Sequence, residues 1–336
     1  AIGFVVLIGV SLINYRFLLK AAPYLYALGV VSLVAVYFFG AVINASRGWF
    51  IIPGIGMNVQ PAEFAKLFII LMLAYFLARK DGEPLRLMRD VVPAGLIVFV
   101  PFVWVMIQPD LGNAVIYLVI MVGMLWIGNI KFFHVLFGLA LAAGGIVGFI
   151  HVLNTFHDEI EQLLESMGAV HWMGRIEAFL DPEQASSDQT YQVNNSMRAI
   201  GSGALFGKGF LQGTSVHGNF IPYTYSDSIF VVVGEEFGFV GASALLLLYF
   251  LLIYRLVLIS IQSSDSGGSY MIIGIISMLV FQVFQNIGMF LGILPLTGIT
   301  LPFISYGGSS LIINMLSLGI AISVRVHAEE PSRETA

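Results

Sequence analysis

Long apolar stretches constrain this chain more than any other feature, because a helix needs about 20 mostly apolar residues to cross the hydrocarbon core of a bilayer. Such stretches recur along the whole sequence and predict an all-α, polytopic helical membrane protein with nine spans. The first stretch is short and begins within an apolar run at Ala1, so we expect one more span to precede it in the intact protein. The predicted spans are residues 1–14, 22–44, 62–78, 91–107, 111–128, 131–152, 229–254, 268–290 and 311–326.

Charged residues are scarce, at 10% of the 336 residues, whereas soluble domains carry about 25%. The formal net charge of −5 provides no basic surface for nucleic acid. The chain has no cysteine, which excludes disulfides, thiolate catalysis and Cys-ligated zinc. The composition therefore excludes soluble globular proteins and nucleic-acid-binding proteins.

The distribution of Lys and Arg predicts the orientation in the membrane. With residues 15–21 as a cytoplasmic loop and the spans alternating, cytoplasmic segments hold ten of the fifteen cations and outer segments hold four. This excess obeys the positive-inside rule and places the C-terminal tail in the cytoplasm. The cytoplasmic set is Arg16, Lys20, Arg79, Lys80, Arg86, Arg89, Lys131, Arg255, Arg325 and Arg333; the outer set is Arg47, Arg175, Arg198 and Lys208.

Two outer segments depart from the pattern of short connections. Residues 153–228 form a long extracytoplasmic loop, whose first part spaces apolar residues from Ile160 to Met167 as an amphipathic surface helix does. Residues 291–310 are uncharged, but their Gly and Pro prevent one regular helix. Irregular backbone at membrane depth is tolerated only against protein or a wet cavity, so we predict a re-entrant outer loop. Residues 1–336 together form a single membrane domain.

Glu63 and Lys66 are ionisable residues inside a predicted span, which is a costly location that usually indicates function. Their spacing of three residues places both on one helix face, near the outer boundary under the predicted topology. Pro61 suits the first helical position, and a carboxylate in the first turn interacts favourably with the helix dipole. The pair is either part of a site or a structural ion pair that fixes its helix to a neighbouring helix.

Asp227 precedes a long apolar run at the outer boundary, where partial withdrawal from water would raise its pKa and suit it to act as a general base. Alternatively, Ser226 or Asp227 only caps the following helix. For Asp110, a turn and an N-cap are the favoured interpretation. The adjacent Glu235 and Glu236 point in different directions on a helix, and we expect a structural role for them.

Arg175, Arg198 and Lys208 are the cations of the long outer loop, and they could hold an anionic headgroup such as pyrophosphate. Alternatively, these three residues are ordinary scattered surface charges that bind no ligand. The Gly-rich stretch at 203–209 does not match a P-loop, since it has three residues between its glycines and no Ser or Thr after the Lys. The six dispersed His form no metal-binding motif and no Ser/His/Asp arrangement.

Several stretches, taken in order, resemble the SEDS family (shape, elongation, division and sporulation proteins), and more specifically its RodA-like members. The stretch 22–40 is similar to the RodA branch rather than to FtsW. The matching motifs are Arg47-Gly48-Trp49, Gln60-Pro61-Ala62-Glu63-Phe64-Ala65-Lys66, Gln108-Pro109-Asp110-Leu111-Gly112, Tyr191-Gln192 through Ala199-Ile200-Gly201-Ser202-Gly203 to Gly207-Lys208-Gly209, Asp227-Ser228-Ile229-Phe230, Gly234-Glu235-Glu236-Phe237-Gly238 and Pro302-Phe303-Ile304-Ser305-Tyr306-Gly307-Gly308-Ser309-Ser310. The family has ten spans with both ends in the cytoplasm.

The resemblance implies a peptidoglycan glycosyltransferase for cell elongation and shape. It would polymerise lipid II, a disaccharide-pentapeptide on undecaprenyl pyrophosphate, at the outer face of the bacterial cytoplasmic membrane. A glycan 4-hydroxyl would attack the anomeric carbon of another unit, with inversion. The implied partner is a class B penicillin-binding protein, a transpeptidase.

Applied to this chain, the resemblance implies that Asp227 is the general base and that Glu63 and Lys66 shape the floor of the site. Arg175, Arg198 and Lys208 would hold pyrophosphate, and Gln192 and Ser305 would contribute to substrate binding. No cofactor is identified with certainty; a divalent cation, Mg²⁺ or Mn²⁺, could assist with pyrophosphate, although no ligand cluster specifies one.

Three alternatives stay open. A lipid II flippase would move the precursor without forming a bond, and a scaffold would only recruit the transpeptidase. An FtsW-type division polymerase would perform the same chemistry in another process. The outer placement of nearly all the unusual polar residues favours the enzyme.

Overall fold

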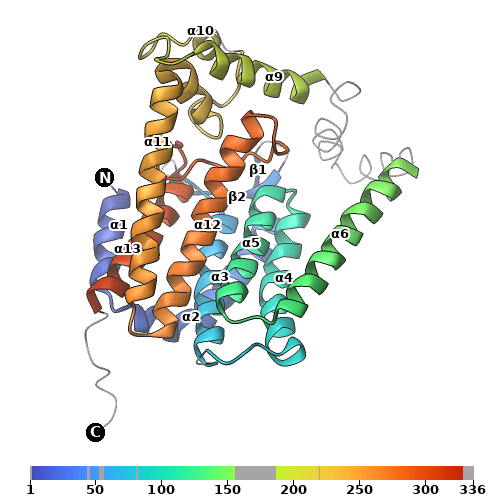
Figure 1. The fold of residues 1–336 in the computed structure, drawn as a ribbon, viewed down its shortest axis with the longest axis vertical. Helices are drawn as coiled ribbons and strands as arrows, with labels where there is room; N and C mark the ends of the chain where they lie inside the picture. The colour runs from blue at the N-terminus through green and yellow to red at the C-terminus, as the bar shows by residue number, and fades with distance from the viewer. Residues whose placement is uncertain are drawn as a thin grey trace.

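The computed structural model describes residues 2–43, 46–52, 57–80, 82–155, 187–218 and 220–327. These ranges are mostly helical, and most of the long helices stand side by side as a bundle (Figure 1). The helices are α1 (Ile2–Leu12), α2 (Tyr15–Phe39), α3 (Pro61–Ala78), α4 (Val92–Ile107), α5 (Leu111–Ile127), α6 (Phe132–Thr155), α9 (Ser187–Ser202), α10 (Thr214–His217), α11 (Ile229–Gln262), α12 (Ser266–Phe290) and α13 (Gly308–His327). A π-helical turn, η1 (Leu87–Val91), leads into α4, and three short strands are β1 (Ala41–Ile43), β2 (Ser46–Ile52) and β3 (Met57–Val59).

Each of the nine predicted spans coincides with a helix. Within the described ranges, six helical segments are long and apolar enough to cross a membrane: α2, α3, η1 with α4, α11, α12 and α13. Three shorter apolar helices stand at the other predicted positions: α1, α5 and Phe132–Gly145 of α6. The structure therefore has the helices of a multi-pass membrane protein, while the count of nine spans stays a prediction.

The boundaries of α2 differ from the prediction. The Asn14 side chain caps the helix by accepting a hydrogen bond from the Arg16 amide (3.0 Å), so the expected loop 15–21 forms the first turns of α2. At the other end, Gly40 adopts an extended backbone and the chain enters β1. β2 pairs antiparallel with both β1 and β3. We did not predict this sheet, because β1 and β3 have only three residues each and the seven residues of β2 do not alternate between apolar and polar.

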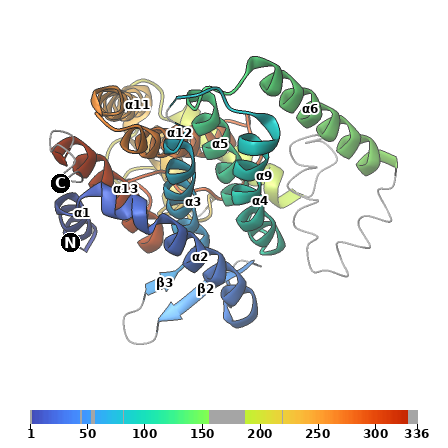
Figure 2. The same ribbon diagram turned by 90° about the horizontal axis from the view of Figure 1, so that it is seen from below.

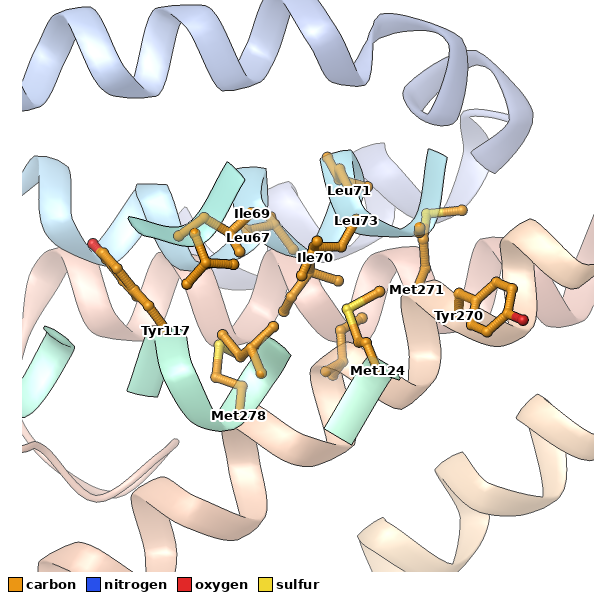
Figure 3. Close-up of a cluster of buried hydrophobic side chains, with 14 of the residues drawn as sticks. Leu67, Ile69, Ile70, Leu71, Leu73, Tyr117, Met124, Tyr270, Met271 and Met278 are labelled. Atoms are coloured by element: carbon orange, nitrogen blue, oxygen red, sulfur yellow. The ribbon is translucent and has the colours of Figure 1, made fainter. Parts of the chain in front are cut away.

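The central helix is α3, which packs against α2, α4, α5, α12 and α13 (Figure 2). Its side chains are buried on most sides, and Figure 3 shows Leu67 and Ile70 among Met124 of α5 and Met278 of α12. Gly274 of α12 allows close approach, because a Cβ there would lie 2.6 Å from a methyl of Ile70. Since lipid is as apolar as these side chains, close packing contributes more here than hydrophobic burial.

Two features shape the end of the molecule at which α9 and α10 lie (Figure 1). α11 is interrupted at Gly238 (φ 65°, ψ −160°), which separates its first turns from the rest. α6 leaves the bundle at an angle (Figures 1 and 2). The predicted long loop 153–228 is partly helical, since α6 continues to Thr155 and the loop contains α9 and α10. The predicted amphipathic helix around Ile160–Met167 lies outside the described residues.

Residues 291–307 connect α12 to α13 without a helix, as their Gly and Pro predict. This connection packs into the bundle: Ile299 and Leu301 are buried. Gly112, at the start of α5, leaves room for it, because a Cβ on Gly112 would lie 2.7 Å from the Ile299 side chain. The connection thus meets the starts of α5 and α13 in one place.

Candidate functional site

A cavity of about 350 Å³ lies where these segments meet. Seven parts of the chain line it: β2, the starts of α3, α5 and α13, the helix α9, the segment before α11 and the connection before α13. The lining residues are Trp49, Gln60, Glu63, Pro109, Asp110, Asn113, Gln192, Tyr223, Ser226, Asp227, Leu296, Thr297, Gly298, Ile299, Thr300, Tyr306, Gly307, Gly308, Ser309 and Ser310. Three predicted site residues therefore share one cavity: Glu63, Gln192 and Asp227.

Glu63 reaches the cavity from the first turn of α3, where Pro61 occupies the first helical position as predicted. Its carboxylate lies 2.8 Å from Lys66 Nζ, and both side chains are buried. Tyr117 of α5 donates a hydrogen bond to the Ala62 carbonyl (2.8 Å), which fixes this turn against α5. Lys66 is beneath the lining rather than part of it, so Glu63 is the member of the pair that reaches the cavity.

Asp110 has two roles. As predicted, it is the N-cap of α5 and accepts a hydrogen bond from the Asn113 amide (3.1 Å). It also lines the cavity, where its second oxygen accepts from Gln60 Nε2 and Asn113 Nδ2, each at 2.8 Å. Burial raises the pKa of Asp110, and the charge of Glu63 acts in the same direction, while the Asn113 hydrogen bonds and Lys66 oppose it.

Asp227 lines the cavity from the segment that precedes α11, and its side chain is half-buried. The N-cap of α11 is Ser228, so neither Ser226 nor Asp227 occupies the capping position that we considered as an alternative. Gly298 faces the carboxylate: a Cβ built there would lie 3.8 Å from Asp227 Oδ2. A half-sheltered carboxylate beside an open cavity can accept a proton from a bound hydroxyl group.

Of the predicted cations, the two that the structure describes, Arg198 and Lys208, do not line this cavity. Lys208 Nζ lies 2.6 Å from Glu235 and donates to Thr214 Oγ1 (2.7 Å), so its charge is already paired. Arg198 is exposed on α9 and is not among the lining residues. It lies about 120° around the helix axis from Gln192, so the two residues are on different faces of α9. Arg175 lies outside the described residues.

The expected structural role of Glu235 and Glu236 agrees with their contacts. Glu235 accepts hydrogen bonds from the amides of Ser215 (2.8 Å) and Val216 (3.0 Å), in addition to Lys208. Glu236 accepts from the Leu211 amide (3.0 Å) and lies 3.2 Å from His217 Nε2. The two carboxylates thus attach residues 208–217 to the first turns of α11.

Ser305 is also placed away from the cavity lining. Its hydroxyl accepts from the Leu301 amide (2.7 Å) and donates to the Ser226 carbonyl (2.7 Å). Both bonds are internal, so the direct substrate contact that we expected of Ser305 has no support in this geometry.

Across the described ranges, no group of three or more His, Asp or Glu side chains comes close enough together to hold a metal ion. The carboxylates of the cavity come from three separate segments and do not form a ligand cluster. The described residues therefore provide no complete set of protein ligands for a divalent cation, and the possible Mg²⁺ or Mn²⁺ stays a prediction.

Sequence reasoning missed several lining residues. Gln60 and Asn113 are neutral and stand beside the residues that we singled out, and Trp49 lies in a sheet that we did not predict. Tyr223 and residues 296–300 belong to irregular segments whose fold depends on distant contacts. The one available signal was the uncharged Gly/Pro-rich connection, which we expected to face protein or a wet cavity.

A family profile described as "cell cycle protein", which covers FtsW, RodA and SpoVE proteins, matches residues 1–330. The chain belongs to this family. It is accordingly a multi-pass membrane protein, as its apolar helices indicate.

Relatives agree with this assignment along nearly the whole chain. Peptidoglycan glycosyltransferase MrdB of Escherichia coli K12 is 36% identical over 335 residues, covering 99% of this chain and 85% of MrdB. Stage V sporulation protein E of Bacillus subtilis is 35% identical over 286 residues, covering 85% of this chain and 73% of that protein. A probable peptidoglycan glycosyltransferase FtsW of Aliivibrio salmonicida is 33% identical over 315 residues (93% and 73%).

Solved structures show the same fold. One, described as the structural coordination of polymerization and crosslinking by a peptidoglycan synthase complex, matches with a TM-score of 0.77 and 27% identity, covering 98% of this chain and 88% of that chain. The rod shape determining protein RodA of Thermus thermophilus matches with a TM-score of 0.68 and 27% identity (98% and 85%).

Proposed function

We propose that this protein is a peptidoglycan glycosyltransferase that polymerises lipid II into glycan strands at the outer face of the cytoplasmic membrane. The observation that supports it most is Asp227, a half-buried carboxylate on a cavity that it shares with Glu63 and Asp110. The relatives named peptidoglycan glycosyltransferase, MrdB above all, supply the reaction class.

In the proposed reaction, Asp227 accepts the proton of the acceptor sugar's 4-hydroxyl. The hydroxyl oxygen forms a bond to the anomeric carbon of the donor on the face opposite its leaving group. The bond between that carbon and the pyrophosphate oxygen breaks, and undecaprenyl pyrophosphate leaves with the bonding electrons. The product has an inverted anomeric centre, and Asp227 returns its proton to solvent.

The remaining lining residues suit sugar binding. Gln60, Asn113 and Gln192 are neutral amides that can donate to and accept from hydroxyl and N-acetyl groups. Glu63 and Lys66 provide a charged but internally paired floor.

The donor's pyrophosphate is anionic and requires cationic partners. Among the described lining residues there is no lysine or arginine. Of the three cations expected to hold pyrophosphate, Arg175 and Arg198 remain candidates, whereas Lys208 is engaged by Glu235.

We further propose that the protein works with a class B penicillin-binding protein. The matched peptidoglycan synthase complex couples polymerization with crosslinking, which is the pairing expected of a polymerase and a transpeptidase. The outward orientation rests on the positive-inside count. The elongation branch rests on the resemblance of residues 22–40 to RodA-like proteins and on the 36% identity to MrdB, against 33% and 34% to two FtsW relatives.

The experiment is polymerisation in vesicles that contain the full chain, a class B penicillin-binding protein and lipid II. The proposal predicts glycan polymer on a gel, together with release of undecaprenyl pyrophosphate. Movement of lipid II across the bilayer without polymer would instead establish the flippase alternative. Vesicles with the transpeptidase alone are the control for polymer made by the partner.

A further inference from the structure

The backbone that carries Asp227 is held by three successive carbonyl groups. The carbonyl of Tyr225 accepts from the Tyr306 amide (2.8 Å), that of Ser226 accepts from Ser305 Oγ (2.7 Å), and that of Asp227 accepts from Asn286 Nδ2 (2.7 Å). All three donors belong to α12 or to the connection that follows it. These bonds therefore fix the position of the segment before α11 relative to α12 and the connection that follows it.

Asn286 has the central place in this arrangement. It projects from α12, its side chain is 0% exposed, and its amide group makes two bonds of 2.7 Å, to the carbonyls of Asp227 and Ile299. Ile299 lines the cavity and lies against the start of α5, next to Asp110. One side-chain amide thus sets the spacing between the Asp227 segment and the wall beside Asp110.

Further contacts restrict the segment before α11 and the connection 291–307 that faces it. Ser228 Oγ donates to the Pro222 carbonyl (2.9 Å), and the Ser226 amide donates to the Tyr223 carbonyl (2.9 Å). Tyr223 (φ 54°) and Phe303 (φ 66°) both adopt the left-handed conformation that non-glycine residues rarely take. Such strain persists only when surrounding contacts impose it, and it is concentrated at functional sites.

We infer that Asn286 and Ser305 are positioning residues that hold the Asp227 carboxylate at the cavity for proton transfer. Neither residue lines the cavity; both bind the backbone that carries Asp227. This inference rests on the proposed function, and it gives Ser305 a role other than the substrate contact expected from sequence. A displacement of about 1 Å at a reacting group can lower a rate on the order of 100-fold.

The alternative is that both side chains only stabilise the fold, since a satisfied buried hydrogen bond contributes to the stability of any protein. Ser323 of α13 separates the two cases. It is fully buried, and its hydroxyl donates to the Ile13 carbonyl (2.6 Å), a contact between distant segments that involves no lining residue. Ser323→Ala is therefore a matched control for Ser305→Ala.

The test uses the full chain with its penicillin-binding protein partner and measures kcat and KM for lipid II polymerisation, together with the Tm of each variant. For Ser305→Ala and Asn286→Leu we expect kcat to fall at least 10-fold and KM to change less than about 3-fold. We expect Ser323→Ala to keep kcat within about 2-fold at a similar loss of Tm. Hydrogen exchange of the peptide spanning 221–229 should accelerate in Ser305→Ala and not in Ser323→Ala.

A failure of the positioning inference can be distinguished from a failure of the proposed function. If wild type forms polymer and Asp227→Asn does not, but Ser305→Ala polymerises at the wild-type rate, the positioning inference is wrong and the proposed function stands. An equal loss in Ser323→Ala would also overturn the inference, because the effect would then follow stability. If Asn286→Leu does not fold, the Ser305→Ala comparison decides alone. Absence of polymer with wild type would contradict the function itself.

Discussion

At the scale of single residues, Lys66 is a fully buried charge with a carboxylate partner. Its side chain is 0% exposed, and its ammonium lies 2.8 Å from Glu63 in the centre of the bundle. Removing one partner of a buried pair costs about 3–5 kcal/mol, because the other charge is left unpaired, while removing both can be nearly neutral.

We therefore expect Lys66→Met and Glu63→Gln each to lower the Tm strongly, and the double variant to recover most of the loss. Thermal unfolding of purified protein in detergent measures this. Polymerisation by the double variant then separates the two interpretations of the pair: recovery of stability without activity indicates that Glu63 contributes to the site. If the Tm loss of the double variant equals the sum of the losses of the two single variants, Glu63 and Lys66 are not coupled.

Asp110 gives a prediction on pH. Its pKa is raised in the folded protein, chiefly by burial. The folded state therefore takes up a proton at a pH where the unfolded chain is still ionised, so this group adds stability as the pH falls through its folded pKa. That contribution is lost as the pH rises above it.

The measurement is the Tm difference between wild type and Asp110→Asn as the pH falls from 7 to about 4, the ordinary pKa of an aspartate. We expect wild type to gain stability relative to Asp110→Asn as the pH falls, because the Asn side chain does not titrate. A difference that stays constant, or changes in the opposite direction, would contradict the raised pKa.

At the scale of elements, the first turns of α11 depend on a close backbone approach. A Cβ on Gly238 would lie 2.3 Å from the Gly207 amide nitrogen, and a Cβ on Gly207 would lie 2.1 Å from the Glu236 carbonyl oxygen. Both glycines have positive φ, at 65° and 78°. Together with the Glu235 contacts, this approach holds residues 203–218 and, through them, the segment that leads to Asp227.

We expect Gly238→Ala to lower the Tm by several degrees, since both the conformation and the space exclude a Cβ. Gly201→Ala is the control. Gly201 is helical in α9 with nothing within 4 Å of a built Cβ, and Ala is favoured over Gly in helices by about 1 kcal/mol. The two substitutions should therefore change the Tm in opposite directions; a harmless Gly238→Ala would contradict the close approach.

At the scale of the whole molecule, the orientation can be tested because the chain has no cysteine of its own. Glu83→Cys introduces a thiol at an exposed site between α3 and α4, and Gln212→Cys introduces one at an exposed site in the outer loop. We expect a membrane-impermeant maleimide to label Gln212→Cys in intact spheroplasts and Glu83→Cys only after permeabilisation. The reverse labelling pattern would show that the orientation in the membrane is opposite to the predicted one.

The parts that were predictable are local in sequence. Glu63 and Lys66 pair because they are three residues apart on one helix, and Asp110 caps the helix that begins beside it. Lys208 illustrates the opposite case: its partner Glu235 is 27 residues away, and no periodicity indicates that contact. The cavity depends on such distant contacts, since its lining extends from Trp49 to Ser310. Sequence therefore predicted single members of the site but not the positioning of Asp227 by Asn286.

The most direct test of the central claim is the polymerisation rate of wild type, Asp227→Glu and Asp227→Asn, each with the penicillin-binding protein partner and lipid II. General bases contribute about 100- to 10,000-fold to a rate. We predict that Asp227→Asn lowers kcat by at least about 100-fold with an unchanged Tm, and that Asp227→Glu retains a measurable fraction of activity. Polymerisation by Asp227→Asn at the wild-type rate would contradict the assignment of Asp227 as the base.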